Sequence, residues 1–396
     1  MKVNLKKIVK EIGIFILILP FFEPEYIISQ VYPIHRFFVL YRYAVALIAT
    51  IIYLKKGKIS KFVLGLLCYN LVIIIATKLN SSYGRIDTAV NNAISVIAIC
   101  LIIELELRKE PKRIINQLLF IFEILIYANF ISMIIYPNGL YSDALYANNW
   151  LLGYDNKHII TILPGMMLTL IYSSYYGKKL KVRSKFLIVI SLISIIRNFS
   201  ATSVLAIVIM IAFVIFRNTI FENTIILNIY NYIITYITLF FTIIIFRLQE
   251  IFRYLIVEIL HKSLSFTGRT GIWDKTMELI KQKAIIGYGV ENSTVRAAKM
   301  NFANATHAHN TILEILYKGG FLALAIYLYI IFIVAKQLNK FRDTMPSKII
   351  SITIFVFFVM MLTEARDVTN FYIILLLGYN VKNILNDINK GVEKIE

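Results

Sequence analysis

The chain has few cysteines and few charged residues. Cys68 and Cys100 are the two cysteines among its 396 residues, both lie in apolar segments, and neither belongs to a CxxC pair. The sequence therefore predicts neither a disulfide framework nor a thiolate metal site. Charged residues make up 16% of the chain and hydrophobic residues 59%, and the mean hydropathy is +0.72. This composition excludes a secreted scaffold, a soluble enzyme and an intrinsically disordered protein, and it predicts a polytopic membrane protein.

Acidic residues are also scarce, since 23 Asp and Glu stand against 42 Lys and Arg, a net charge of +19. Nucleic acid is one partner that such a charge could suggest. The basic residues, however, fall in short clusters between apolar runs of roughly 17–25 residues, the length of a membrane span. The charge pattern thus indicates membrane topology and argues against nucleic acid as a partner.

The N-terminal segment resembles a signal peptide but lacks a small-residue cleavage site. Pro20 to Pro24 stands where that site would be, so we expect an uncleaved first span over roughly 11–29, broken at Pro20, with the N-terminus in the cytoplasm. Together with eleven further apolar segments, this span predicts an all-α membrane protein of about 12 transmembrane helices. The further spans are expected at about 37–54, 61–79, 88–105, 114–136, 158–175, 186–200, 202–217, 224–246, 311–335, 348–363 and 370–386.

Basic residues gather in four of the loops expected on one side of the membrane. The clusters lie at 55–61, 108–113, 178–185 and 336–348, whereas an intervening loop such as 138–157 carries few charges. Positive residues mark cytoplasmic loops. The alternation agrees with twelve spans and predicts a multi-pass protein of the cytoplasmic (inner) membrane with both termini in the cytoplasm.

One long connection, from Arg247 to Asn310, lies outside under this topology. It separates residues 1–246, with nine spans, from residues 311–396, with three spans and a cytoplasmic C-terminus. It carries nine basic and five acidic residues, a surplus that runs against the topological bias. Either an anionic ligand or a solvated helical face accounts for these cations. Long loops often carry function, so we expect the site here.

Within this loop, apolar residues between Ile272 and Ile280 suit a short amphipathic helix lying on the membrane. Thr267 to Thr270 would form its N-terminus, where free amides, the positive end of the helix dipole and Arg269 suit a phosphate. An ordinary cap beside a surface arginine is the alternative.

A G-x-G pair follows at Gly287 and Gly289. A dinucleotide fingerprint would need a third glycine where Asn292 stands, so nucleotide binding is excluded. A tight turn that returns the chain to the membrane explains both glycines.

Two histidines, His307 and His309, immediately precede the tenth predicted span. At a helix N-terminus the dipole disfavours imidazolium, which suits His309 to act as a base. A structural pair and a zinc site are the alternatives; no cysteine and no convincing third ligand accompany the histidines, so no metal is expected. Glu314 can pair with Lys318 at i,i+4, which favours helix support over catalysis.

Several other charged residues are placed near the outer face. Arg42 would lie inside the second span and should have a carboxylate or phosphate partner, whereas snorkelling accounts for Arg36 and Arg366. The full set is Arg36, Arg42, Arg197, Glu364, Arg366 and Asp367.

Taken in order, these motifs resemble the O-antigen ligase and polymerase family of bacterial surface polysaccharide synthesis. The family pattern is an arginine and then a tryptophan in a long external loop, a G-x-G, an H-x-H-N before a span and a glycine further on. The matching positions are Arg269, Trp273, Gly287, Gly289, His307, His309, Asn310 and Gly320. The resemblance covers roughly residues 190–335, where Arg197 to Ser203 resembles the family's Arg/Ser segment.

The resemblance implies transfer of an oligosaccharide from undecaprenyl pyrophosphate to an acceptor sugar hydroxyl at the outer face, without metal or cofactor. Arg269 and Arg197 would stabilise the charge left on the diphosphate, and His309 would be the general base of an inverting displacement. The further candidates for substrate binding are His307, Asn310, Trp273 and Glu364. The partners so implied are the lipid-linked oligosaccharide, the bilayer, a chain-length regulator and a flippase.

Two related activities compete with an O-antigen or capsule polymerase. The ligase branch often has a glycine and a threonine where this chain has Ala323 and Leu324, which favours a polymerase over a ligase. A flippase for lipid-linked oligosaccharide handles the same lipid, but flippases generally have two related halves and short external loops.

Overall fold

The computed structural model describes residues 5–56, 58–143, 146–177, 179–216, 228–248, 268–302, 305–366 and 368–392, and the regular structure of these residues is helical. Thr267 and Asp367, both named above, lie outside the described residues. The helices up to the long connection are α1 (Leu5–Ile18), η1 (Leu19–Phe22), α2 (Glu25–Gln30), α3 (Tyr32–Lys55), α4 (Lys61–Leu79), α5 (Ile86–Leu107), α6 (Pro111–Ile135), α7 (Asp155–Ser174), α8 (Val182–Arg197), α9 (Ala201–Phe216), α10 (Ile229–Leu239) and η3 (Phe240–Ile245).

The long connection and the C-terminal region add six helices to the described part. These are α11 (Arg269–Gln282), α12 (Ser293–Met300), α13 (Thr311–Lys340), α14 (Met345–Met361), α15 (Thr369–Tyr379) and α16 (Val381–Val392).

Helices coincide with each of the twelve predicted spans. Among the helices of the described residues, five are long and apolar enough to cross a membrane, namely α3, α4, α5, α6 and α13. Shorter apolar helices lie at Ile12–Phe22, Ala201–Phe216, Ile229–Ile245, Met345–Met361 and Thr369–Tyr379. The all-α, multi-pass architecture is thus supported, whereas the number twelve and the side of the termini stay predictions.

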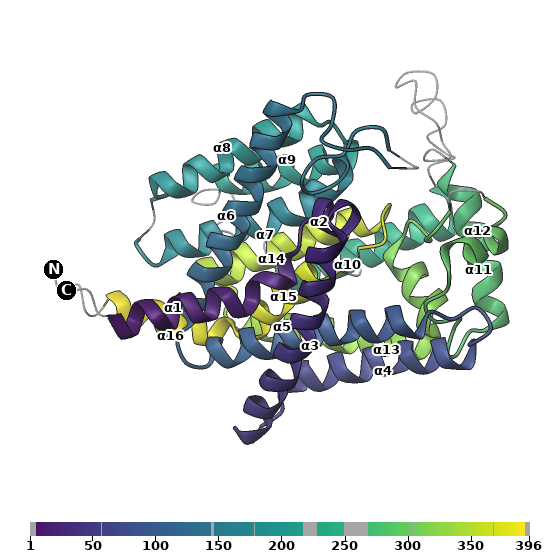
Figure 1. Cartoon of the computed structure of the whole chain (residues 1–396), viewed down its shortest axis with the longest axis horizontal. Coiled ribbons are helices and arrows are strands. Elements are labelled where there is room, and N and C mark those ends of the chain that lie inside the picture. The colour runs from purple at the N-terminus through teal and green to yellow at the C-terminus, as the bar shows by residue number, and fades with distance from the viewer. Residues whose placement is uncertain are drawn as a thin grey trace.

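Helices α1 and α16 lie at one end of the bundle, and α11 and α12 lie at the other (Figure 1). There α11 packs against α13, which in turn packs along α4 and α15, while α14 packs against α7, α9 and α15. The turn before α13 and the loop after α14 therefore meet beside the two helices of the long connection.

The first predicted span is broken at Pro20, as expected. Pro20 lies in the short 3-10 turn η1 between α1 and α2, because proline has no N–H to continue an α-helix. Arg42 of α3 points to this break: its Nη1 lies 3.4 Å from Oε2 of Glu23 and donates to the carbonyl of Pro20 at 3.3 Å. The carboxylate partner predicted for Arg42 is confirmed.

Helix α13 is kinked at Gly320, whose φ of +61° is not helical. The segment before α12 fills the kink, since the amide of Phe321 donates to the carbonyl of Ala284 at 2.7 Å. A Cβ on Gly320 would lie 2.3 Å from the carbonyl carbon of Ile285. Only glycine therefore fits where the two backbones meet.

The G-x-G pair forms the other half of this contact. The amides of Tyr288 and Gly289 donate to the carbonyls of Tyr317 and Lys318, each at 2.8 Å, and Gly287 and Gly289 both have positive φ. The turn predicted from the glycines is thus present. It also locks the long connection onto the broken helix.

The sequence predicts α11 as an amphipathic helix on the membrane surface. Its apolar side is covered by protein: Trp273 is 0% exposed, and Leu279 and Ile280 are 7% exposed. An amphipathic pattern serves equally for packing on a neighbouring helix, and here α13 supplies that neighbour. The amphipathic pattern thus marks a face that packs on protein, and the place of α11 relative to the membrane stays a prediction.

Candidate active site

Three separate segments bring charged side chains together at this end of the bundle. Arg269 starts α11, His309 lies in the turn before α13, and Glu364 follows α14. Nη2 of Arg269 donates to Oε1 of Glu364 at 2.6 Å, and Nδ1 of His309 lies 3.6 Å from Oε2 of Glu364. One carboxylate therefore contacts both residues that the sequence placed in catalysis.

The surroundings keep Glu364 ionised. Burial by itself would raise the pKa of this carboxyl group, but contact with His309 and the charges of Arg366 and Arg269 outweigh it and lower the pKa to about 2. The Glu364 side chain is 6% exposed. A buried, negatively charged group is thus present beside His309 at neutral pH.

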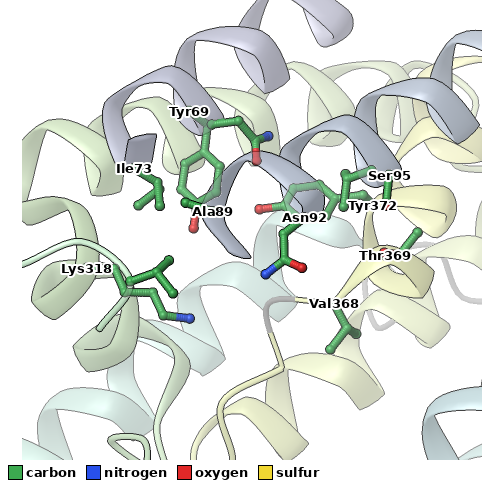
Figure 2. Close-up of a pocket in the computed structure, with 12 residues that line it drawn as sticks. Tyr69, Ile73, Ala89, Asn92, Ser95, Lys318, Val368, Thr369 and Tyr372 are labelled. Atoms are coloured by element: carbon green, nitrogen blue, oxygen red, sulfur yellow. The ribbon is translucent and has the colours of Figure 1, made fainter. Parts of the chain in front are cut away.

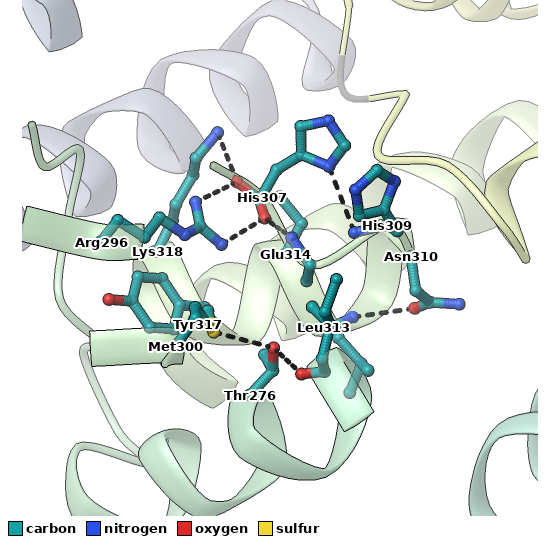
Figure 3. Close-up of polar contacts among 12 residues, drawn as sticks. Thr276, Arg296, Met300, His307, His309, Asn310, Leu313, Glu314, Tyr317 and Lys318 are labelled. Carbon is teal, nitrogen blue, oxygen red and sulfur yellow. Dashed lines mark hydrogen bonds and ion pairs between the residues drawn. The ribbon is translucent and has the colours of Figure 1, made fainter. Parts of the chain in front are cut away.

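The two histidines lie against each other (Figure 3), with ring centroids 4.0 Å apart. The amide of His309 donates to Nδ1 of His307 at 3.3 Å, and His309 has a φ of +48°, in the left-handed region. Burial, and then the nearby His309, lower the pKa of His307 to about 4. His307 is therefore neutral at pH 7, and the backbone turns sharply at His309, whose side chain faces Glu364.

A buried ion pair lies beside this turn and holds it in place (Figure 3). Arg296 of α12 donates to both oxygens of Glu314, at 2.8 and 2.6 Å. Oε2 of Glu314 also accepts the amide of Ala308 at 2.9 Å. Lys318 lies 3.0 Å from Oε1 of the same carboxylate, which confirms the predicted i,i+4 pair. The sequence assigned no role to Arg296.

Asn310 and Trp273 are turned inward. Asn310 is fully buried; its Oδ1 accepts the amide of Leu313 as the N-cap of α13, and its Nδ2 donates to the carbonyl of Leu362 at 3.1 Å. Trp273 is 0% exposed in the core. Both side chains are packed inside the protein, where they can hold neighbouring segments in position. Direct contact of either side chain with substrate is not supported.

Arg197 and Arg366 differ from expectation in opposite ways. Arg197 ends α8 with an exposed side chain, and the contacts found among the described residues do not join it to Glu364.

Arg366 was predicted to extend its side chain toward the membrane surface. Instead it is 4% exposed and donates to the carbonyl of Asn156 at 2.9 Å. The snorkelling explanation of Arg366 was wrong, because this side chain turns into the protein. The hydroxyl of Ser200 donates to Oδ1 of the same Asn156.

In the part of the chain that the structure describes, one group of side chains could hold a metal ion. A nitrogen of His307, a nitrogen of His309 and an oxygen of Glu364 all lie within 4.8 Å of one another. The sequence-based argument that no third ligand accompanies the histidines therefore fails. Charge argues against a cation all the same, since Arg269 already binds Glu364 and Arg366 adds positive charge nearby.

A family comparison bears on the same segments. Residues 186–328 match the model of the family described as O-antigen ligase. This match confirms the resemblance to the O-antigen ligase and polymerase family. The matched region contains Arg197, Arg269, His307 and His309, while Glu364 lies beyond it. No curated protein matches the chain.

Proposed function

We propose that this protein is a repeat-unit polymerase of O-antigen or capsule. It would move an oligosaccharide from undecaprenyl pyrophosphate to a sugar hydroxyl of an acceptor chain at the outer face of the membrane. The observation that carries the proposal is the contact of Glu364 with both Arg269, at 2.6 Å, and His309, at 3.6 Å. A fixed cation and a supported base side by side are the groups that this transfer needs.

Arg269 would act on the donor. Displacement breaks the bond between the anomeric carbon and the diphosphate oxygen, which leaves negative charge on the diphosphate. A guanidinium has five N–H donors, and Glu364 accepts from one end of this one, so the remaining donors can bind a phosphate. Arg197, exposed at the end of α8, is proposed as a second contact for the donor.

His309 would act on the acceptor. Its Nδ1 faces Glu364, so Nε2 is the nitrogen available to take the proton of the attacking hydroxyl. The ionised carboxylate would then stabilise the imidazolium, the role that a carboxylate has beside a catalytic histidine. The acceptor oxygen bonds to the anomeric carbon as the diphosphate leaves, so the anomeric configuration inverts.

A ligase is the second candidate, because the matching family model carries that description. A ligase would use the same donor chemistry and would differ in passing finished chains to another acceptor. Ala323 and Leu324, where the ligase branch often has glycine and threonine, favour the polymerase.

The test is a polymerisation assay with the purified protein in lipid vesicles. The native lipid-linked repeat unit is supplied as both donor and acceptor, and the products are resolved on a gel. We expect a ladder from the wild type and a loss of a hundredfold or more in His309→Ala and Arg269→Ala. Arg36→Ala, an exposed arginine in α3, is the matched control and should leave the ladder unchanged. A full ladder from both active-site variants, inserted at normal levels, would contradict the proposed roles.

A further inference from the structure

A cavity with a mixed polar and apolar lining lies between four helices. It has a volume of about 280 Å³, is partly open, and is lined by residues of α4, α5, α13 and α15 together with Val290 and Val368 (Figure 2). Its polar lining includes Asn70, Asn92, Ser95, Lys318, Thr369 and Tyr372. Three of these helices are among those apolar enough to span a membrane. Polar side chains between membrane-spanning helices are costly, and they commonly mark a ligand path.

The cavity and the histidine turn share one residue. The amino group of Lys318 points into the cavity (Figure 2) and lies 3.0 Å from Oε1 of Glu314. The other oxygen of Glu314 holds the amide of Ala308, between the two histidines. On the opposite side, Val368 and Thr369 line the cavity shortly after Glu364 in the chain. The cavity is thus joined to the histidine turn through Lys318 and Glu314, and one of its walls follows Glu364 by four residues in the chain.

We propose that this cavity binds a sugar portion of the acceptor glycan. The name "acceptor" rests on the proposed function; the binding of sugar rests on the lining itself. Amide and hydroxyl groups such as those of Asn92, Ser95 and Thr369 both donate and accept hydrogen bonds, as sugar hydroxyls require. The ring of Tyr372 supplies an apolar face.

The charge and the volume of the cavity favour a sugar over the donor diphosphate as its ligand. Lys318 is the cation that lines the cavity, and it is already paired with Glu314, so little positive charge remains for a diphosphate. The volume is just below the range of about 300–1,000 Å³ typical of small-molecule sites. It therefore suits one or two sugar rings at the end of a chain.

Asn92→Leu tests the inference, with Asn91→Leu as its matched control. Asn91 is the same residue type one position earlier in α5 and does not line the cavity. Ser95→Leu, which narrows the cavity by another route, is the second variant. Neither cavity residue belongs to the Arg269, His309 and Glu364 cluster.

Two readouts are measured on the full chain in detergent or vesicles. The first is the binding of the oligosaccharide released from the lipid-linked repeat unit, followed by titration calorimetry. The second is the rate of transfer to this released oligosaccharide, supplied as a distinguishable acceptor at varied concentration while the concentration of the lipid-linked donor is held constant. We expect Asn92→Leu and Ser95→Leu to weaken glycan binding and raise the acceptor KM by about tenfold or more. The donor KM, and the behaviour of Asn91→Leu, should not change.

The outcomes separate this inference from the proposed function. Weaker glycan binding in the cavity variants supports a sugar site, even if the wild type makes no polymer and the polymerase proposal fails. Unchanged glycan binding in both variants, or no binding by the wild type, would overturn the inference. Loss of inorganic pyrophosphate binding in Asn92→Leu would overturn it in favour of a donor diphosphate site.

Discussion

Arg296 and Glu314 form a two-bond ion pair that supports the histidine turn without touching either histidine. Both side chains are buried, at 6% and 3% exposure, and the guanidinium also lies 4.2 Å from the ring centroid of Tyr317. Because Glu314 in turn binds the amide of Ala308, the pair connects α12 and α13 to the site.

Arg296→Ala should therefore destabilise the fold. Removing one partner leaves a buried carboxylate with Lys318 alone as a cation, and breaking such a pair costs about 3–5 kcal/mol. We expect less folded protein after a heat step, measured by fluorescence-detected size exclusion. Lys275→Ala, which breaks the exposed pair with Glu278, should change stability by no more than about 0.5 kcal/mol. Equal behaviour of the two variants would show that the buried pair is not structural.

Gly320→Ala should also destabilise the protein. The added Cβ would meet the backbone of Ile285 at 2.3 Å, and φ is +61° there, so we expect a loss of more than about 1–3 kcal/mol. Gly13→Ala in α1 is the control, because a Cβ on Gly13 meets nothing within 4 Å. The same heat step distinguishes them, and a fully stable Gly320→Ala would mean that the kink of α13 can straighten.

Glu364→Gln should lower turnover while the protein remains folded. Glutamine retains the shape but not the charge, so it would hold Arg269 less well and would not stabilise an imidazolium on His309. We expect kcat to fall about a hundredfold with a smaller change in the donor KM. Glu278→Gln, on the exposed side of α11, serves as the control. Unchanged kcat in Glu364→Gln would remove this carboxylate from the mechanism.

The stability of the folded protein should decrease as the pH falls, because of the buried His307. Burial lowers the pKa of His307 from 6.5 to about 4, so the unfolded chain takes up a proton at a pH where the folded chain does not. This contribution is fully present above pH 6.5 and is lost progressively as the pH falls toward 4. His307→Gln, which cannot titrate, should show a smaller drop in melting temperature between pH 7 and pH 4.5. An equal drop in both proteins would contradict the assignment.

The sequence predicts much of the fold because membrane spans leave strong local signals. Length, hydropathy and proline placed the helices, and the break at Pro20 and the partner of Arg42 followed from local chemistry. The amphipathic pattern of α11 was found, but its partner was not, because periodicity shows that a face is apolar and does not show what covers it.

The candidate site was predicted only in part, because a sequence shows motifs but does not show contacts between distant residues. Arg269 and His309 lie in motifs, and a motif is visible in one dimension. Glu364, Arg366 and Arg296 act through contacts with residues 18 or more positions away. The residue types and the sequence spacing of these three residues do not indicate which residue each one contacts. The cavity at Asn92 and Lys318 was missed because its lining comes from helices distant in the chain.

Chelation should leave activity unchanged, although His307, His309 and Glu364 are close enough to share an ion. A cation bound there would have to displace Arg269 from Glu364 and would lie near Arg366, so electrostatic repulsion opposes it. We expect protein treated with a chelator to make the same ladder as untreated protein, and metal analysis to find less than one ion per chain. Loss of the ladder after chelation, with recovery on adding zinc, would instead make the two histidines metal ligands and would remove His309 as the base. His307→Ala separates the two outcomes further, because a metal site would lose its ion in this variant, whereas the proposed base on His309 would remain.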